Sequence, residues 1–393
     1  MPGWHERTQQ LEASGQLKNI SIVQEQHPSR TRLFMQWQGI SWPTMVDSLN
    51  LLGLEVVPVT LLIDEEGIVR YRGSVENLEA FLALEAPASL PKPKIFDKPA
   101  LAAQAPEEAL VEHANQLFLW GGDARLDEVI ETYQRRLSAI EGDSSLSDER
   151  ARLHFRLGVS LRRRADSDHR QAGDFRAAVE HWQQALEIEP NQYIWRRRIQ
   201  QYGPRLEKPY SFYDWVEAAR REIEARGETP VALDIEPRGA ELATPSRDFA
   251  VAAEAEPPTQ AYRITRDEAG LIDLEKTLVP AAVTPGSAAR VHLVFRTNPA
   301  VKGHWNNEAD DTEVWIEAPE GWQIDRRRLT VGNPPQLVSD EPRHFELEVR
   351  SPKGAESTEL QGFALYYVCE DVQGTCLYRR QDFTVELPVR SGD

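Results

Sequence analysis

The amino-acid sequence predicts a multidomain protein in which an α/β layer, an all-α helical region and an all-β sandwich follow one another. Three observations carry this prediction. Strand-like and helix-like segments alternate up to residue 85, apolar residues then recur every three to four positions over residues 107–226, and they recur at every second position over residues 261–390. At roughly 150 residues per domain, the 393 residues allow two or three domains with cores of their own.

Composition and charge exclude several broad classes. The chain has 45 Lys and Arg against 63 Asp and Glu, a formal charge of -18, which argues against a general nucleic-acid binder. The most apolar stretch, residues 49–63, contains Asn50, Glu55 and Pro58 and is shorter than the roughly 18 apolar residues that a membrane span requires. We therefore expect no nucleic-acid partner and no membrane span.

The first predicted domain, residues 1–85, contains short elements of both kinds. Residues 19–23 are β-branched and strand-like, and residues 30–37 favour a helix. The apolar run at 56–63 stops at the polar residues 64–67 and resumes at 68–72, which predicts a β-hairpin. Alternating elements of this kind indicate an α/β layer.

The middle of the chain is predicted to be helical between two linkers. Residues 86–106 are rich in Ala, Pro and Lys, which is typical of a semi-extended linker. Residues 107–226 have helical periodicity, broken by Gly-Asp pairs at 122–123, 142–143 and 173–174, so we expect helical hairpins. Residues 227–260 carry five prolines among Ala and Glu and predict a second, mobile linker.

The last predicted domain, residues 261–390, reads as strands with one buried face. Three segments alternate apolar and polar residues: Val291, Leu293 and Phe295; Phe345, Leu347 and Val349; Phe383, Val385 and Leu387. Pro- and Gly-containing turns separate them. The simplest fold is an antiparallel β-sandwich of about 130 residues.

The helical region resembles a tetratricopeptide repeat. Leu157, Gly158 and Leu161 match the first helix of the repeat, and residues 173–190 match its second helix and terminal proline, although residues 162–171 exceed the 34-residue unit. The resemblance implies paired helices and a groove that binds a peptide. Ordinary helical hairpins without such a groove remain the alternative.

Residues 53–73 resemble the second half of a thioredoxin-like domain of the redoxin or TlpA type. The match rests on Val57-Pro58-Val59-Thr60, a strand that ends in Ile63-Asp64, and the turn at Gly67. The resemblance covers residues 2–82 and implies a cis bond before Pro58. Val57 and Pro58 would then present a backbone edge on which a substrate peptide pairs.

The same resemblance fails where the redox chemistry of the family resides. Family members carry a Cys-x-x-Cys pair, or one nucleophilic Cys, at the start of the first helix, where the helix dipole favours a thiolate. Residues 1–7 contain no thiol, and His5 is expected to be a surface residue. Either the given sequence begins inside the domain, or the domain is a redox-inactive binding module.

The chain contains two cysteines, Cys369 and Cys376. The aromatic strand before Cys369 and the turn at Gly374 place the pair opposite each other at the end of a hairpin, where a disulfide can form. Closing so short a loop stabilises by about 2.5 kcal/mol in the chain-entropy model, too little to explain a whole domain. A redox-active pair is favoured over a structural disulfide, and over free thiols or metal ligands.

Residues 262–389 resemble the N-terminal immunoglobulin-like domain of the DsbD family of thiol:disulfide interchange proteins. The specific match is Tyr366-x-x-Cys369, Gly374 and Cys376 ahead of a strand that ends at Pro388. The spacing is one residue longer than usual, and residues 377–380 replace a Tyr-Pro-Pro sequence. The resemblance implies that Cys369 and Cys376 exchange a disulfide with a thioredoxin-like or other redox protein.

The function expected from these features is that of a bacterial envelope protein of the thiol-disulfide oxidoreductase type. The rival expectation is a non-catalytic scaffold that binds peptides at the thioredoxin-like edge and the helical groove, with Cys369 and Cys376 as a structural disulfide. We expect a periplasmic or other extracytoplasmic location, with a cytoplasmic one still open. No cofactor is predicted, and His304 in residues 304–308, with His292 or His344, is a weaker metal candidate than a packed loop.

Overall fold

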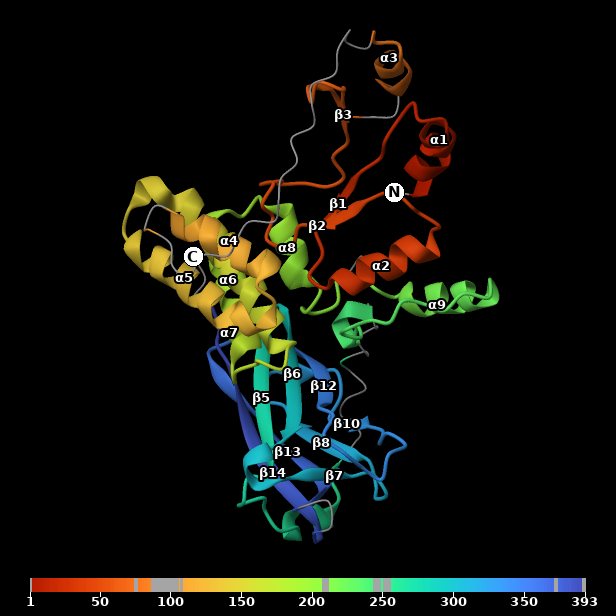
Figure 1. Cartoon of the computed structure of the whole chain (residues 1–393). Coiled ribbons are helices and arrows are strands. Elements are labelled where there is room, and N and C mark those ends of the chain that lie inside the picture. Colours follow the sequence, from red (N-terminus) through yellow and green to blue (C-terminus); the bar gives the residue numbers. More distant parts are fainter. Residues whose placement is uncertain are drawn as a thin grey trace. The chain divides into compact units, whose positions relative to one another are not determined.

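We describe a computed structural model of the chain over residues 2–73, 77–85, 106, 109–206, 212–242, 249, 256–370 and 374–390. The chain divides into two compact units (Figure 1). The first comprises Met1–His169, Gln184–Arg197 and Asp214–Glu236, and the second comprises Arg170–Gln183, Arg198–Tyr213 and Pro237–Asp393. The chain is thus a multidomain mixture of helices and sheets. The linker predicted at 86–106 lies outside the described residues, except for residue 106.

The N-terminal part of the first unit contains short helices and strands. They are α1 (Pro2–Ala13), β1 (Ser21–Val23), α2 (Pro28–Trp37), β2 (Thr44–Val46), β3 (Leu61–Ile63), β4 (Val69–Arg72) and α3 (Leu78–Leu82). β1 pairs in parallel with β2, and β3 pairs antiparallel with β4, so two separate two-stranded sheets form. The predicted strand, helix and hairpin are confirmed, although β3 covers only Leu61–Ile63 of the apolar run at 56–63.

Asp64 determines the turn of the β3–β4 hairpin. Its Oδ1 accepts hydrogen bonds from the backbone N–H groups of Glu66 and Ile68, both at 2.9 Å. The bond from Ile68 is the main reason that the pKa of Asp64 lies below its usual value. An aspartate that ties down its own turn in this way fixes the register of the two strands.

Helices follow in the predicted region, with breaks at the Gly-Asp pairs. They are α4 (Leu110–Trp120), η3 (Asp123–Arg125), α5 (Leu126–Ala139), η4 (Ser144–Leu146), α6 (Ser147–Ala165), α7 (Asp174–Ile188), α8 (Tyr193–Gln200) and α9 (Val216–Ala225). α4 packs on α5, and α5 packs on α6. Gly173 takes the left-handed conformation, with a φ of 86°, directly before α7. No helix in the described ranges is both long and apolar enough to cross a bilayer.

Polar contacts join the strands of the first unit to its helices. The Gln26 side chain donates to the carbonyl of Val159 at 3.2 Å, and the His27 ring lies 2.9 Å from the Asp166 carboxylate. Burial raises the pKa of Asp166, but Arg162 and His27 outweigh burial and lower it. A buried carboxylate that keeps its charge beside the Arg162 guanidinium and hydrogen-bonds the His27 ring holds this junction together.

The described start of the second predicted linker is packed rather than mobile. The side chain of Gln36 in α2 donates to the carbonyl of Thr229 and accepts from the N–H of Val231, both at 2.9 Å. The N–H of Asp234 donates to the Ser29 hydroxyl at 3.1 Å. The prediction of a mobile linker is therefore wrong for residues 229–235, because α2 offers side-chain partners for their backbone.

The second unit contains the strands predicted for the last part of the chain. They are β5 (Ile272–Val279), β6 (Ala288–Thr297), β7 (His304–Asn306), β8 (Thr312–Glu317), β9 (Gln323–Ile324), β10 (Arg328–Val331), β11 (Val338–Ser339), β12 (Arg343–Arg350), β13 (Thr358–Cys369) and β14 (Cys376–Leu387), with 3₁₀ turns η5 (Gly239–Leu242), η7 (Thr259–Arg263) and η8 (Pro299–Val301). One antiparallel sheet has the order β5-β6-β12-β9. The other has the order β10-β8-β13-β7-β11, with β14 on β13. Alternating residues of both sheets share one core, including Val291, Leu347, Tyr366 and Val385.

A buried ion cluster lies on the outer face of the β5-β6-β12-β9 sheet. The Arg290 guanidinium contacts Glu346 at 2.9 Å and Glu348 at 2.6 Å; Arg290 and Glu348 are nearly inaccessible to solvent, and Glu346 is largely covered. Burial lowers the pKa of Arg290, but the two carboxylates reverse this and raise it. Glu346 also accepts the N–H of Ala240, and Glu348 accepts the N–H of Arg205, so the cluster ties loop backbone to the sheet.

Candidate functional site

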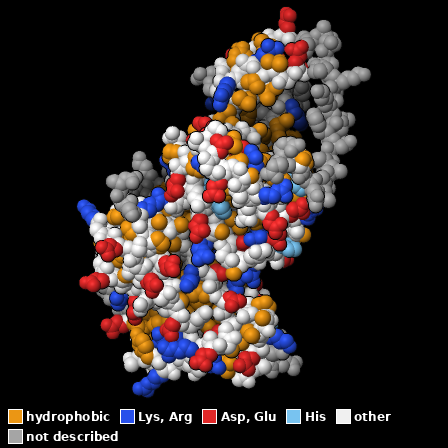
Figure 2. Space-filling view, turned by 90° about the vertical axis from the view of Figure 1, so that its left-hand side faces the viewer, with side chains coloured by type: hydrophobic (Ala, Val, Ile, Leu, Met, Phe, Trp, Pro, Cys, Tyr) orange, Lys and Arg blue, Asp and Glu red, His pale blue; other side chains and the backbone are white. Residues whose placement is uncertain are grey.

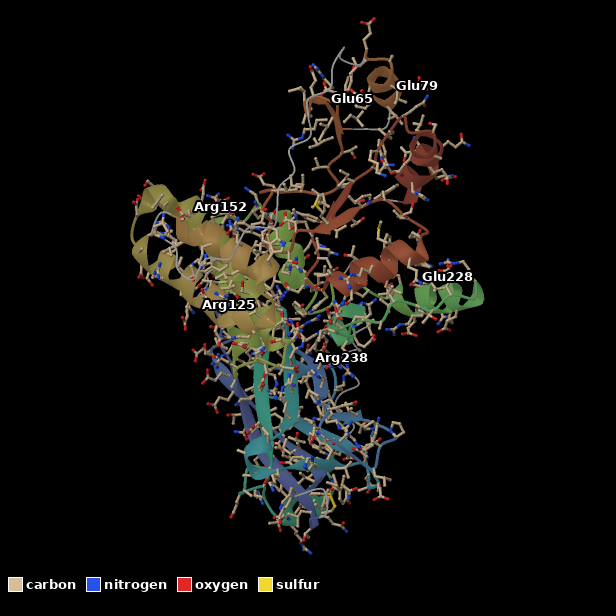
Figure 3. The ribbon with its side chains drawn as sticks, viewed as in Figure 1. Glu65, Glu79, Arg125, Arg152, Glu228 and Arg238 are labelled. Atoms are coloured by element: carbon tan, nitrogen blue, oxygen red, sulfur yellow. A yellow bond between two sulfur atoms is a disulfide. The ribbon has the colours of Figure 1, made fainter. Side chains whose placement is uncertain are left out.

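The two cysteines form a disulfide at the turn end of the β13–β14 hairpin (Figure 3). β13 and β14 pair along their whole length, and Cys369 is directly opposite Cys376 in the register. Their Cα atoms are 4.0 Å apart and the S–S distance is 2.10 Å. The predicted pairing at the hairpin end is confirmed.

The two halves of the disulfide differ in their access to solvent. Cys369 is 3% exposed, because β7 pairs with β13 on one side of it and β14 pairs on the other. Cys376 is exposed at the first position of β14. A molecule that approaches the disulfide from solvent therefore meets the Cys376 sulfur first.

His304 stands in one row with the disulfide across three strands. The register places His304 of β7 opposite Cys369 of β13, which is opposite Cys376 of β14. Directly opposite residues of neighbouring strands point to the same face of a sheet. The next row, Trp305 and Val368, is buried in the core, so the row of His304 lies on the outer face. Nδ1 of His304 is 2.7 Å from the Asp340 carboxylate.

Two tyrosines continue the outer face along the hairpin. Tyr367 and Tyr378 stack with ring centroids 4.4 Å apart. Burial, followed by the charge and hydrogen bond of Asp310, raises the pKa of Tyr367. Burial and the neighbouring Tyr367 raise the pKa of Tyr378. The surface beside the disulfide is thus aromatic with neutral hydroxyl groups, a composition common in protein-binding patches.

The second predicted site residues, Val57 and Pro58, are at the surface of the first unit. The peptide bond between them is cis, as the thioredoxin-like resemblance implies, and Val57 is 48% exposed. Large apolar side chains are exposed throughout this part of the chain: Ile20, Ile22, Met45, Leu52, Val56, Leu61, Ile63, Ile68 and Val69. Figure 2 shows a hollow with hydrophobic side chains around it in the upper part of the molecule, where Figure 1 has β1 to β4.

The histidines considered as metal ligands are not gathered in one place. His304 belongs to β7 rather than to a loop, and it contacts Asp340. His292 of β6 contacts the carbonyl of Tyr202 at 2.7 Å and the Glu346 carboxylate at 3.6 Å. Over the described residues, no group of three or more His, Cys, Asp or Glu side chains is arranged to hold a metal ion.

Comparison with known proteins does not identify a family. No protein-family model matches the chain, and no curated protein matches it. Among solved structures, similarities include the yeast GGA1 GAE domain, with 12% identity over 31% of this chain and 96% of that one and a TM-score of 0.20. AvmM, which catalyses macrocyclization in alchivemycin A biosynthesis, has 10% identity over 33% of this chain and 97% of that one and a TM-score of 0.19. The Pseudomonas fluorescens alkylpurine DNA glycosylase AlkC has 12% identity over 73% and 100% and a TM-score of 0.17.

These TM-scores are too low to carry a conclusion about fold or function, so the site must be interpreted from its own geometry. Sequence reasoning found both cysteines but missed the partner of His304. Asp340 lies 36 residues after His304 in the chain, and no local spacing connects the two. Only the pairing of β7 with β11 and β13 brings them together.

Proposed function

We propose that the second unit is a thiol-disulfide exchange module whose redox pair is Cys369 and Cys376. The observation that carries the proposal is the asymmetric disulfide at the turn end of the hairpin, with Cys376 exposed and Cys369 buried. A disulfide buried at both sulfurs would be difficult for a partner to reach, and an eight-residue loop gives little stability in return for its closure. Accessible disulfides of this kind are the labile and catalytic ones.

The exchange runs through a mixed disulfide. A partner thiolate attacks the Cys376 sulfur, the bond between the two cysteines breaks, and Cys369 leaves as a thiolate that takes up a proton. The second thiol of the partner then loses its proton and attacks the partner sulfur that is bonded to Cys376. The mixed disulfide breaks, and Cys376 is released as a thiolate. The partner dithiol is oxidised to a disulfide, and the protein is reduced by two electrons.

We further propose that the chain combines DsbD-like, thioredoxin-like and tetratricopeptide-like regions. The DsbD-like features of residues 262–389 are supported by two antiparallel sheets with a shared core and by the cysteine hairpin. The thioredoxin-like features are supported by the cis bond before Pro58 and by the β3–β4 hairpin. The tetratricopeptide-like features are supported by the consecutive helices α4 to α7. We extend the proposal to a bacterial, extracytoplasmic protein with a thioredoxin-like partner, because such disulfides persist in oxidising compartments.

The reduction potential of the Cys369–Cys376 pair tests this function. We expect thiol trapping of the purified full-length protein across a glutathione series to give a potential above about -270 mV, within the range of exchange proteins. A potential below about -300 mV would identify a structural disulfide and contradict the proposal. The Cys369→Ser, Cys376→Ser double variant has no thiol to label and gives the background signal of the trapping assay.

A second function, peptide binding by the first unit, is favoured by a separate observation. β1 and β3 each pair with only one strand among the described elements, and exposed aliphatic side chains flank both. Short two-stranded sheets are marginal by themselves, and parallel sheets are normally covered on both faces. We propose that an extended segment of a partner protein with apolar side chains adds to these strands, because Ile20, Ile22, Leu61 and Ile63 on and beside them are aliphatic and exposed. In the same scaffold, the cis-Pro edge at Val57 and Pro58 and a groove in the helical region would be further places where peptides bind.

A designed peptide tests strand addition. We expect a labelled peptide of alternating valine and threonine to bind the full-length protein, and Ile22→Lys to weaken this binding at least about tenfold by placing a charge beside β1. Leu119→Lys, at an equally exposed apolar position in α4, is the matched control and should leave binding unchanged. Equal binding of a peptide with proline at every second position, which cannot form a ladder, would contradict strand addition.

A further inference from the structure

We infer that His304, held by Asp340, is the acid–base partner of Cys369 in disulfide exchange. This inference rests on the proposed function of the cysteine pair and adds a residue to it. The role assigned is to protonate the Cys369 thiolate when the disulfide opens and to take the proton back when it closes.

The position of His304 follows from the strand register. His304, Cys369 and Cys376 occupy directly opposite positions of β7, β13 and β14, on the face of the sheet away from the core. Opposite residues of antiparallel strands have Cβ atoms about 4.5–5.5 Å apart, within reach of an imidazole ring. Cys369 therefore has its cystine partner on one side and a histidine on the other.

The contact with Asp340 gives the ring a defined orientation. Nδ1 is 2.7 Å from the Asp340 carboxylate, so Nδ1–H donates to that group, and the other nitrogen, Nε2, is left for a second partner. No other hydrogen bond or ion pair of this ring is present among the residues that the structure describes. The His304 side chain is 21% exposed, which keeps it accessible to a proton from solvent while Cys369 is not.

Burial of Cys369 creates the need for such a group. When Cys376 is attacked, the departing electron pair forms a thiolate on Cys369, a buried sulfur that water reaches poorly. An uncompensated charge in such a place is unfavourable, and a neighbouring imidazolium neutralises it by charge or by proton transfer. The charged and titratable groups near His304 are Lys302 before β7, Asp340 and Glu341 before β12, Arg343 in β12, Cys369 and Glu370 at the end of β13, and Tyr367 and Tyr378 on the same outer face of β13 and β14. The Arg343 guanidinium lies over the Trp305 ring, in the buried row, so His304 is the cationic candidate in the row of the disulfide.

The pH dependence of thiol reactivity tests the inference. The reduced full-length protein is alkylated with iodoacetamide from pH 5 to 9, and Cys369 and Cys376 are quantified separately by mass spectrometry. For His304→Gln we expect the Cys369 profile to shift to higher pH, with a rate at neutral pH at least about tenfold below that of the unaltered protein. Asp340→Asn keeps the ring but removes its carboxylate partner and should give a smaller shift. His169→Gln, at an exposed histidine of the first unit, is the matched control and should give no shift.

The reduction potential provides a second readout that a purely structural role would not move. An imidazolium that stabilises the thiolate favours the reduced protein, so His304→Gln should lower the potential by about 30 mV for each tenfold change in the exchange equilibrium. An active unaltered protein with identical Cys369 profiles and potentials in His304→Gln would overturn the inference and leave the exchange function intact. If the unaltered protein exchanged no disulfide with glutathione, the proposed function itself would fail, and this inference with it.

Discussion

Cys369→Ser and Cys376→Ser are expected to react with oxidised glutathione at very different rates. In Cys369→Ser the exposed Cys376 thiol attacks the disulfide of oxidised glutathione, and the mixed disulfide accumulates because the resolving thiol is absent. In Cys376→Ser the remaining thiol is 3% exposed, so its adduct should form at least about tenfold more slowly, since oxidation follows thiol exposure. Intact-mass spectrometry over time measures both adducts, and neither single variant can complete a cycle of exchange.

The control for this experiment is denaturation. In denaturant both single variants should react at similar rates, because the difference arises from burial in the folded sheet and not from the thiols themselves. Equal rates in the native proteins would show that burial of Cys369 does not govern reactivity. That result would remove the assignment of Cys376 as the sulfur that partners attack.

Arg290→Ala is expected to destabilise the second unit by about 3–5 kcal/mol, because it leaves the carboxylates of Glu346 and Glu348 buried without their cation. The protein is multidomain, so a single melting temperature would mix the two units. Hydrogen exchange of β6 and β12 amides in the full-length protein isolates the effect. For amides that exchange through unfolding of this unit, the exchange rate should increase by a factor between about a hundred and a few thousand.

Arg328→Ala is the matched control on the same unit. Arg328 also pairs with a glutamate, Glu313, but its side chain is half exposed, and such surface pairs contribute at most about 1 kcal/mol. Amides of β6 and β12 should therefore exchange at nearly unchanged rates in Arg328→Ala. Similar exchange in the two variants would mean that the Arg290 cluster is solvated in solution and does not hold the loops to the sheet.

Several elements could be predicted from local sequence because their physical cause is local. The two-residue alternation of Val291, Leu293 and Phe295 identifies a strand with one buried face, and the structure buries all three. The Gly-Asp pair at 173–174 begins α7 for a reason contained in a few residues, since Gly173 takes the left-handed conformation directly before the helix. The cysteine hairpin was predictable in the same way, since a turn and two flanking strands specify which residues are opposite each other.

Other features could not be predicted from local pattern because they depend on partners distant in the chain. Residues 229–235 read as a mobile linker, yet Gln36 and Ser29 of α2, about 200 positions earlier, take up their backbone groups. A proline-rich composition shows that a segment lacks periodicity, but it does not show whether another element satisfies its N–H and C=O groups.

Local sequence patterns predict a chain that mixes helices with antiparallel strands, and they predict that Cys369 and Cys376 meet at a hairpin end. The packing of strands and loops in three dimensions buries Cys369 and exposes Cys376, brings Asp340 to His304 in the same row, and encloses Arg290 between two glutamates. The reason is physical. Periodicity and turn chemistry act over a few residues, whereas burial and charge pairing depend on which strands lie side by side.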